Sequence, residues 1–147
     1  MLEYAEKAIS GRIPVSRWVR MACERHQRDL GRKDIVWDLP AALKVFRFFK
    51  HVLRLNGGQF EGKPFELLPF EQFIVGSLFG WKLADGTRRY SMAYIEIGKG
   101  NGKSPLAAGI GMAGLIADKE PRAEIYAAAT KKDQAMILFR LRLERNS

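Results

Sequence analysis

The stretch that most constrains the fold of this chain is Tyr94–Ile110, which reads YIEIGKGNGKSPLAAGI. An apolar β-branched run is followed by a glycine-rich stretch, then by Gly102-Lys103-Ser104 and small residues at helical spacing. The pattern predicts a strand over Tyr90–Ile97, a loop, and a helix over Lys103–Ala117. This order places backbone N–H groups and the positive end of a helix around one anion. The sequence therefore predicts a phosphate-binding loop.

The loop matches most of the phosphate-loop motif G-x-x-x-x-G-K-[ST], also called Walker A. Gly102, Lys103 and Ser104 fit, but Ile97 stands where the first glycine belongs and Gly98 comes one position late. In this motif the lysine reaches the β- and γ-phosphates of a nucleotide and the hydroxyl binds Mg²⁺. The motif and its flanks favour nucleotide binding, while the alternative is a glycine-rich turn with exposed lysines.

Two further motifs that resemble nucleotide-binding patterns lie in the helix predicted after the loop or at its end. The residues Gly109–Gly114 spell G-x-G-x-x-G, and Gly114–Glu120 resembles an apolar strand that ends in carboxylates. A dinucleotide fingerprint must follow a strand directly, and a catalytic carboxylate strand cannot be the tail of a helix. We therefore interpret these glycines as sites of close packing between the helix and a sheet. We also expect a half-exposed helical His26 and a buried, unreactive Cys23.

Other segments give weaker predictions of secondary structure. We expect an amphipathic helix over residues 14–30 and a short helix from Pro69 to about Gly80. Between them we expect a helix that Asp38 caps, that runs through Leu53 and that ends at Asn56-Gly57-Gly58. We also expect a hairpin turn at Asp85-Gly86-Thr87, a strand over Ala123–Ala129 and a helix that opens at Thr130. The order of these elements predicts an α/β chain with a helical N-terminal subdomain, residues 1–84, followed by the opening strands of a nucleotide-binding sheet, residues 85–147.

The charge of the chain favours an anionic partner. It carries 25 Lys and Arg against 16 Asp and Glu, a net charge of +9. Residues 1–60 hold 12 basic and 6 acidic side chains, so any nucleic-acid surface is expected there. One cysteine and two histidines provide no metal-binding spacing and no internal disulfide. The sequence also shows no signal peptide or membrane-spanning run, so we expect a cytoplasmic protein without a membrane partner.

Four ordered segments of the chain resemble the N-terminal part of the large terminase subunit of tailed bacteriophages. They are IPVSRWVRMACERHQRDL (13–30), GGQFEGKPFELLPFEQFIVGSLFGW (57–81), DGTRRYSMAYIEIGKGNGKSPLAAGIG (85–111) and AEIYAAATKKDQA (123–135). The resemblance implies an ASCE-type P-loop NTPase fold and a phage or prophage motor that uses ATP and Mg²⁺. In this family an N-terminal ATPase drives DNA into the capsid and a C-terminal nuclease cuts it. The implied partners are double-stranded DNA, the terminase small subunit, the portal protein and further copies of the chain.

The resemblance also implies roles for individual residues. The loop would be formed by Gly98, Gly100, Asn101 and Gly102, with Lys103 on the phosphates and Ser104 on Mg²⁺. Lys99 stands where many members have an arginine that stabilises the transition state, and a lysine lacks its planar fork. The adenine-recognising glutamine of the family falls at Glu71, after Phe70, with Gln72 next. Because an ionised glutamate cannot donate to adenine, we favour Gln72, and a solvent-facing residue is the alternative.

The remaining implications concern the second half of the ATPase. Thr130, Lys131 and Gln134 follow the second predicted strand and would lie near the ATP-binding edge of the sheet. The carboxylate strand of the family and its acidic nuclease site have no counterpart among these residues. We therefore expect a truncated large subunit with an incomplete sheet, which binds ATP but hydrolyses it poorly. The competing interpretations are another P-loop ATPase, such as a helicase-like protein, and a DNA- or partner-binding fragment without catalysis.

Overall fold

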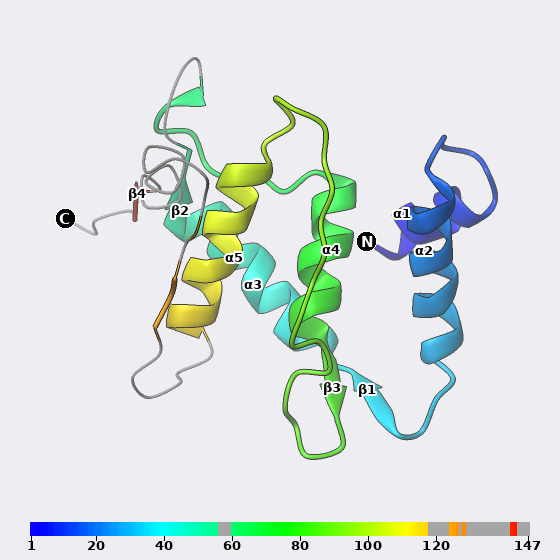
Figure 1. Ribbon diagram of the computed structural model, residues 1–147. Helices are drawn as coiled ribbons and strands as arrows, with labels where there is room; N and C mark the ends of the chain where they lie inside the picture. Colours follow the sequence, from blue (N-terminus) through cyan, green and yellow to red (C-terminus); the bar gives the residue numbers. More distant parts are fainter. Residues whose placement is uncertain (56–59, 118–123, 127, 129–141, 144–147) are drawn as a thin grey trace. The chain divides into compact units, whose positions relative to one another are not determined.

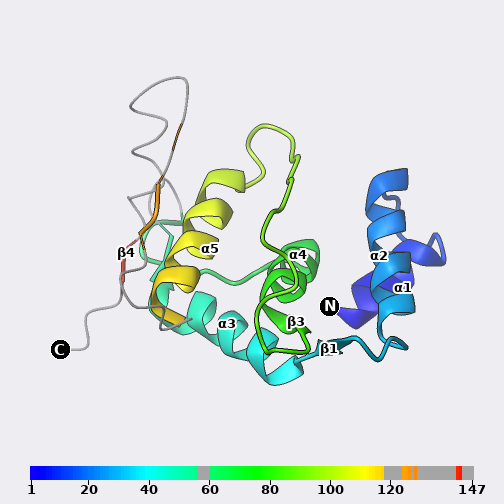
Figure 2. The same ribbon diagram turned by 60° about the horizontal axis from the view of Figure 1, so that its bottom comes forward.

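The computed structural model describes residues 1–55, 60–117, 124–126, 128 and 142–143 of the chain. It has two compact units, each built from two separate segments of sequence. Unit 1 comprises Met1–Phe46 and Leu67–Ala93, and unit 2 comprises Arg47–Glu66 and Tyr94–Ser147. Figure 1 and Figure 2 show the helices and strands of both units from two directions.

Unit 1 begins with two helices that pack through small side chains. Helix α1 spans Leu2–Ile9 and helix α2 spans Arg17–Asp29. The N–H of Val19 donates to the Ser16 hydroxyl at 3.3 Å, which caps the start of α2 as a serine at this position should. The two helices contribute to a hydrophobic cluster whose buried residues are Ala5, Ala8, Cys23 and Phe73. Helix α2 confirms the predicted helix in this region, whereas α1 was not among our predictions.

Two further helices of the chain start at capped positions. Helix α3 spans Leu39–Val52, and the N–H of Ala41 donates to the Asp38 carboxylate at 2.9 Å. Helix α4 spans Pro69–Gly80 and begins with a proline, which has no N–H to leave unsatisfied. Both helices confirm the predicted elements, but α3 ends at Val52, before the predicted end at Asn56-Gly57-Gly58, because Leu53–Arg54 form the short strand β2.

A small antiparallel pair of strands links these helices. Strand β1 spans Ile35–Trp37 and strand β3 spans Trp81–Leu83. The register pairs Ile35 with Leu83, Val36 with Lys82, and Trp37 with Trp81. The predicted turn follows β3: the N–H of Leu83 donates to the carbonyl of Thr87 at 2.9 Å, and Gly86 has a φ of +83°. A positive φ favours glycine, so this turn is determined by its local sequence.

The core of unit 1 is aromatic and encloses one histidine. The rings of Trp37, Phe73 and Trp81 surround His26, which is only 3% exposed. The indole N–H of Trp81 donates to Nδ1 of His26 at 3.0 Å. Our prediction of a half-exposed His26 was therefore wrong, because aromatic rings from β1, α4 and β3 cover the side of α2 that carries this residue.

Unit 2 is centred on helix α5, which spans Lys103–Ala117 and confirms the predicted helix. Gly109 of α5 lies against α3, since a Cβ at this position would stand 2.4 Å from Cε1 of Phe49. Phe49 in turn packs on Phe65 with ring centroids 5.1 Å apart. The short strands β2, Leu53–Arg54, and β4, Arg142–Leu143, form an antiparallel pair. Gly109 is thus a site of close packing inside a helix, as predicted, but it packs against helix α3 and not against a sheet, and a Cβ at Gly114 would meet no neighbour within 4 Å.

The predicted strand over Tyr90–Ile97 is wrong for the described structure, because no described segment forms a ladder with it. Alternation along the segment persists: Tyr94 is 88% exposed, while Ile95 and Ile97 are half-buried. A strand requires a neighbour that accepts its hydrogen bonds, and apolar alternation alone does not provide one. The strand pairs that the structure does describe are antiparallel and lie elsewhere in the chain.

The predicted second strand, Ala123–Ala129, falls only partly within the described residues. Its described positions, 124–126 and 128, are irregular and form no strand. The predicted helix opened by Thr130, with Lys131 and Gln134, lies outside the described residues. Those predictions therefore have no structural counterpart to compare.

Candidate functional site

The candidate site in unit 2 is the loop from Gly98 to Gly102. The N–H of Asn101 and its side-chain amide each lie 3.4 Å from the carbonyl oxygen of Gly98, which closes a tight turn. Gly100 and Gly102 have φ values of +85° and +72°. Residues with a side chain rarely adopt a positive φ, so both positions favour glycine. The loop thus places a compact, exposed backbone directly before α5.

The loop is followed directly by the N-terminus of α5. The carbonyl of Gly102 accepts from the N–H of Leu106 at 3.0 Å, which begins the helical hydrogen bonds. The first N–H groups of a helix have no acceptor within it, and the helix dipole makes that end positive. The first turn of α5 carries no acidic side chain. This end of α5 is therefore suited to an anion.

Cationic and hydroxyl side chains flank the same backbone. Lys99 is in the loop and Lys103 is the first residue of α5, and both are exposed. Ser104 follows and is half-buried. A Cβ built at Gly100 meets no heavy atom within 4 Å, so open space adjoins the loop there. Exposed amides, two ammonium groups and a hydroxyl can together bind a phosphate chain.

The two candidates for adenine recognition lie in unit 1, at the start of α4. The Glu71 carboxylate is buried and accepts from the N–H of Leu68 at 2.8 Å, which caps the helix. Burial raises the pKa of Glu71 above its usual range, and the bond from Leu68 partly opposes that rise. The Gln72 side chain is half-buried and donates to the Leu67 carbonyl at 3.0 Å. The Glu71 carboxylate is thus engaged in capping α4, and the Gln72 amide donates one hydrogen bond to the segment just before the helix.

A salt bridge that sequence reasoning missed anchors the chain ahead of the loop. The Arg89 guanidinium donates to the Asp29 carboxylate at 2.6 Å, and Asp29 is only 4% exposed. Arg89 also lies over the rings of Trp81 and Tyr90, at 5.5 and 5.0 Å. Asp29 and Arg89 are 60 residues apart in the sequence, and no local signal connects them. This contact holds the residues that lead toward Tyr94 to helix α2.

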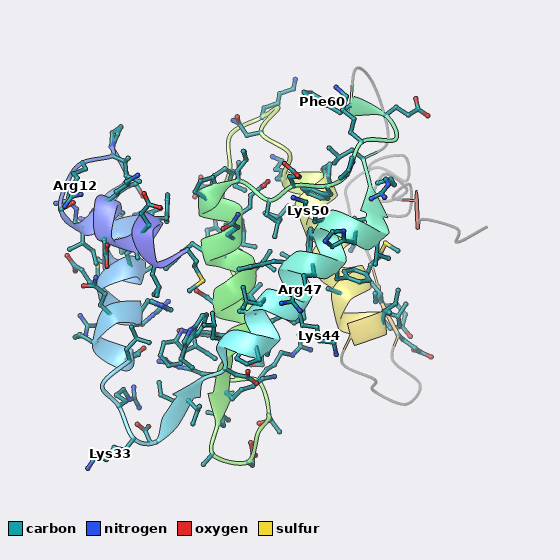
Figure 3. All side chains as sticks on the ribbon, turned by 180° about the vertical axis from the view of Figure 1, so that it is seen from behind. Arg12, Lys33, Lys44, Arg47, Lys50 and Phe60 are labelled. Atoms are coloured by element: carbon teal, nitrogen blue, oxygen red, sulfur yellow. The ribbon has the colours of Figure 1, made fainter. Side chains whose placement is uncertain are left out.

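Helix α3 carries three exposed basic side chains within residues 1–60, where the sequence predicts any nucleic-acid surface. Lys44, Arg47 and Lys50 are exposed at successive intervals of three residues, and Figure 3 labels all three on this helix. Lys50 also pairs with Glu66 at 3.0 Å, and both side chains remain more than half exposed. Exposed pairs of this kind contribute little stability, so the pair with Glu66 does not prevent Lys50 from contacting an anionic partner.

Within the described part of the chain, no group of three His, Cys, Asp or Glu side chains is arranged to hold a metal ion. A Mg²⁺ ion bound with a nucleotide needs no such cluster, because phosphate oxygens and water supply most of its ligands. The described helices also include none that is long and apolar enough to cross a bilayer.

A comparison with protein-family models finds a match over the second half of the chain. The model described as the terminase large subunit ATPase domain matches residues 69–145, just over half of the chain. The matched region contains helix α4, the glycine loop and helix α5. Searches of curated proteins and of solved structures gave no match.

Proposed function

Because this chain belongs to the terminase large subunit family, we propose that it is the ATP-binding part of a motor that packages DNA into a phage capsid. The observation that carries the proposal is the loop Gly98–Gly102, which closes on itself and opens α5 inside the region matched by the family. The order of an extended segment, a glycine loop and a helix is the order of a P-loop NTPase. We assign that fold to residues 85–147, and residues 1–84 form the helical subdomain before it.

In this proposal the backbone of the loop holds the phosphates of ATP. Gly98, Gly100, Asn101 and Gly102 let the chain approach the phosphate oxygens, since glycine places no side chain in the way. The Lys103 ammonium pairs with the β- and γ-phosphates, and the Ser104 hydroxyl is a ligand of Mg²⁺. Bound Mg²⁺ would neutralise charge on the β- and γ-oxygens. The exposure of the loop and the cations beside it fit such a ligand.

Two further residues have proposed roles. Lys99 stabilises negative charge that develops on the transferred phosphoryl group, as a point charge rather than as a bidentate donor. Gln72 recognises adenine through the part of its amide that the Leu67 carbonyl does not engage. The capping role of Glu71 supports the choice of Gln72, because a carboxylate bonded to the Leu68 amide is already occupied.

The partners follow from the family and from the basic surface of α3. We propose that Lys44, Arg47 and Lys50 contact the phosphates of double-stranded DNA. The terminase small subunit and the portal protein would be the protein partners, several copies would act together, and the motor would work in the cytoplasm of the bacterial host. Phosphate contacts release counterions, so this DNA binding should fall steeply as salt rises and should not depend on base sequence.

The test of nucleotide binding is the affinity of the purified chain for a fluorescent ATP analogue, with and without Mg²⁺. We expect weak binding that Mg²⁺ strengthens, and negligible steady-state hydrolysis, because no catalytic carboxylate is assigned. A charge-assisted hydrogen bond contributes about 1.5–3 kcal/mol, so Lys103→Ala should weaken binding by roughly 10- to 100-fold. The matched control is Lys33→Ala, which removes an exposed lysine far from the loop in sequence.

Equal affinities of the two lysine variants would contradict the assignment of the loop. Robust hydrolysis that Lys103→Ala abolishes would contradict the weak turnover but would support the ATPase.

A second candidate function is a DNA-binding element without nucleotide chemistry, which the exposed basic side chains of α3 favour. It predicts salt-dependent DNA binding that Arg47→Glu weakens and that ATP leaves unchanged. DNA binding together with no detectable ATP binding would select this candidate.

A further inference from the structure

Helix α2 has an outer face whose side chains the proposed ATP and DNA sites do not use. Trp18, Met21, Arg25 and Arg28 succeed one another at spacings of three and four residues, so they form one stripe along the helix. Trp18 is 64% exposed and Met21 is 54% exposed, and both arginines are exposed as well. We call these four residues the α2 stripe. Its opposite face is already buried, since Cys23 and His26 belong to the core of unit 1.

The composition of the stripe and its flanks is unusual for a solvated helix. Helix α2 contains four arginines and no lysine, and two large apolar side chains lie among the arginines. Tryptophan, methionine and arginine are enriched at protein interfaces, while lysine is depleted there. Tryptophan and arginine are also the residues that most often dominate binding energy. The basic side chains of α3, by comparison, include two lysines.

Part of this face is already arranged for binding. The Arg17 guanidinium lies over the Trp18 ring, 4.2 Å from its centroid, and Arg25 lies 5.7 Å from the ring of Tyr90. Side chains that stack in this way lose less conformational freedom when a partner arrives. Among the described residues, Arg20 and Arg28 form no ion pair. Their charge is thus available to a carboxylate.

The charge of this face specifies the partner. Helix α2 carries four arginines, at positions 17, 20, 25 and 28, but only one partly exposed carboxylate, that of Glu24. A duplex would satisfy the arginines but would leave Trp18 and Met21 uncovered, since B-DNA presents phosphates and not an apolar surface to a helix face. An acidic protein helix with an apolar stripe matches both kinds of side chain.

We propose that the outer face of α2 docks an acidic amphipathic helix of a protein partner, with Trp18 and Met21 as apolar anchors and the surrounding arginines paired with carboxylates. This inference is independent of the phosphate loop and of the basic side chains of α3. Loss of ATP or DNA binding would therefore leave it intact.

The probe is a fluorescein-labelled three-heptad peptide with Leu at the first and fourth positions of each heptad and an excess of Glu elsewhere. A second peptide replaces each Leu by Ser and keeps the charge. Binding to the full chain is measured by fluorescence anisotropy. We expect the Leu peptide to bind more tightly than the Ser peptide. The double variant W18A/M21A should weaken binding of the Leu peptide about tenfold or more and leave the Ser peptide within about twofold.

The matched control is Leu2→Ala, which removes an exposed apolar side chain from α1 and should leave both affinities unchanged. Arg20→Glu/Arg28→Glu should weaken binding of both peptides, because it reverses charge without touching the anchors. Circular dichroism of each variant checks that the helices persist.

Two outcomes would overturn the proposal. If both peptides bind equally and W18A/M21A changes neither, the surface attracts acidic chains by charge alone. If W18A/M21A weakens binding of single-stranded oligo-dT as much as that of the Leu peptide, Trp18 stacks on bases and the surface is a nucleic-acid site.

Discussion

The close approach of α5 to α3 makes a sharp prediction about two glycines of one helix. In Gly109→Ala the new Cβ would stand 2.4 and 2.6 Å from two carbons of the Phe49 ring and 3.2 Å from Cδ1 of Leu53. Phe49 and Leu53 are both fully buried, so neither can move into solvent. In Gly114→Ala the new Cβ meets no heavy atom within 4 Å.

Both substitutions gain the same helix propensity, which is about 0.8–1 kcal/mol for Gly to Ala inside a helix. Only Gly109→Ala also carries a cost of overpacking, which is typically about 1–3 kcal/mol. We therefore expect Gly114→Ala to be slightly more stable than the wild type. Gly109→Ala should be less stable than Gly114→Ala by about 1–3 kcal/mol, roughly 3 °C per kcal/mol in Tm for a chain of this size.

The assay is urea unfolding followed by circular dichroism at the helical minimum, with thermal unfolding as a second measurement. A second variant makes the cause explicit: Phe49→Leu removes part of the ring, so Gly109→Ala should cost less in that background than in the wild type. The reasoning is refuted if Gly109→Ala is as stable as Gly114→Ala, or if its cost is the same with Leu at position 49.

Two further predictions concern the core of unit 1. Arg89→Ala should lower the free energy of unfolding by about 3 kcal/mol because it strips the buried Asp29 carboxylate of its closest partner. Arg32→Ala, whose guanidinium lies 3.6 Å from Asp29 and is half exposed, should cost less than about 1 kcal/mol; equal costs in urea unfolding would contradict this. Burial lowers the pKa of His26, and the charge of Asp29 opposes part of that shift. The unfolded chain therefore takes up the proton at a higher pH than the folded chain, so the free energy of unfolding should decrease as the pH falls below about 6.5. Urea unfolding at pH 7.5 and 5.5 should show this loss in the wild type and in His51→Gln, and a smaller loss in His26→Gln; an unchanged loss in His26→Gln would count against it.

The candidate loop is the part of the site that the sequence determined. Gly100 and Gly102 adopt the positive φ that favours glycine, and α5 begins at Lys103 as its pattern predicts. The Asp38 cap of α3 and the turn around Gly86 were also predictable. In each case the deciding interaction joins residues within a few positions of one another, so a short window of sequence contains both partners.

Tertiary structure alone decided the features that depend on distant partners. His26 is buried because aromatic rings from three other elements close over it, and its partner Trp81 is 55 residues away. Asp29 holds Arg89 across an even longer separation. Helical periodicity records which face of α2 is apolar but not which segments will cover it. The extended run before the loop shows the same limit, because a strand forms only where another segment supplies the hydrogen bonds that its own residues cannot.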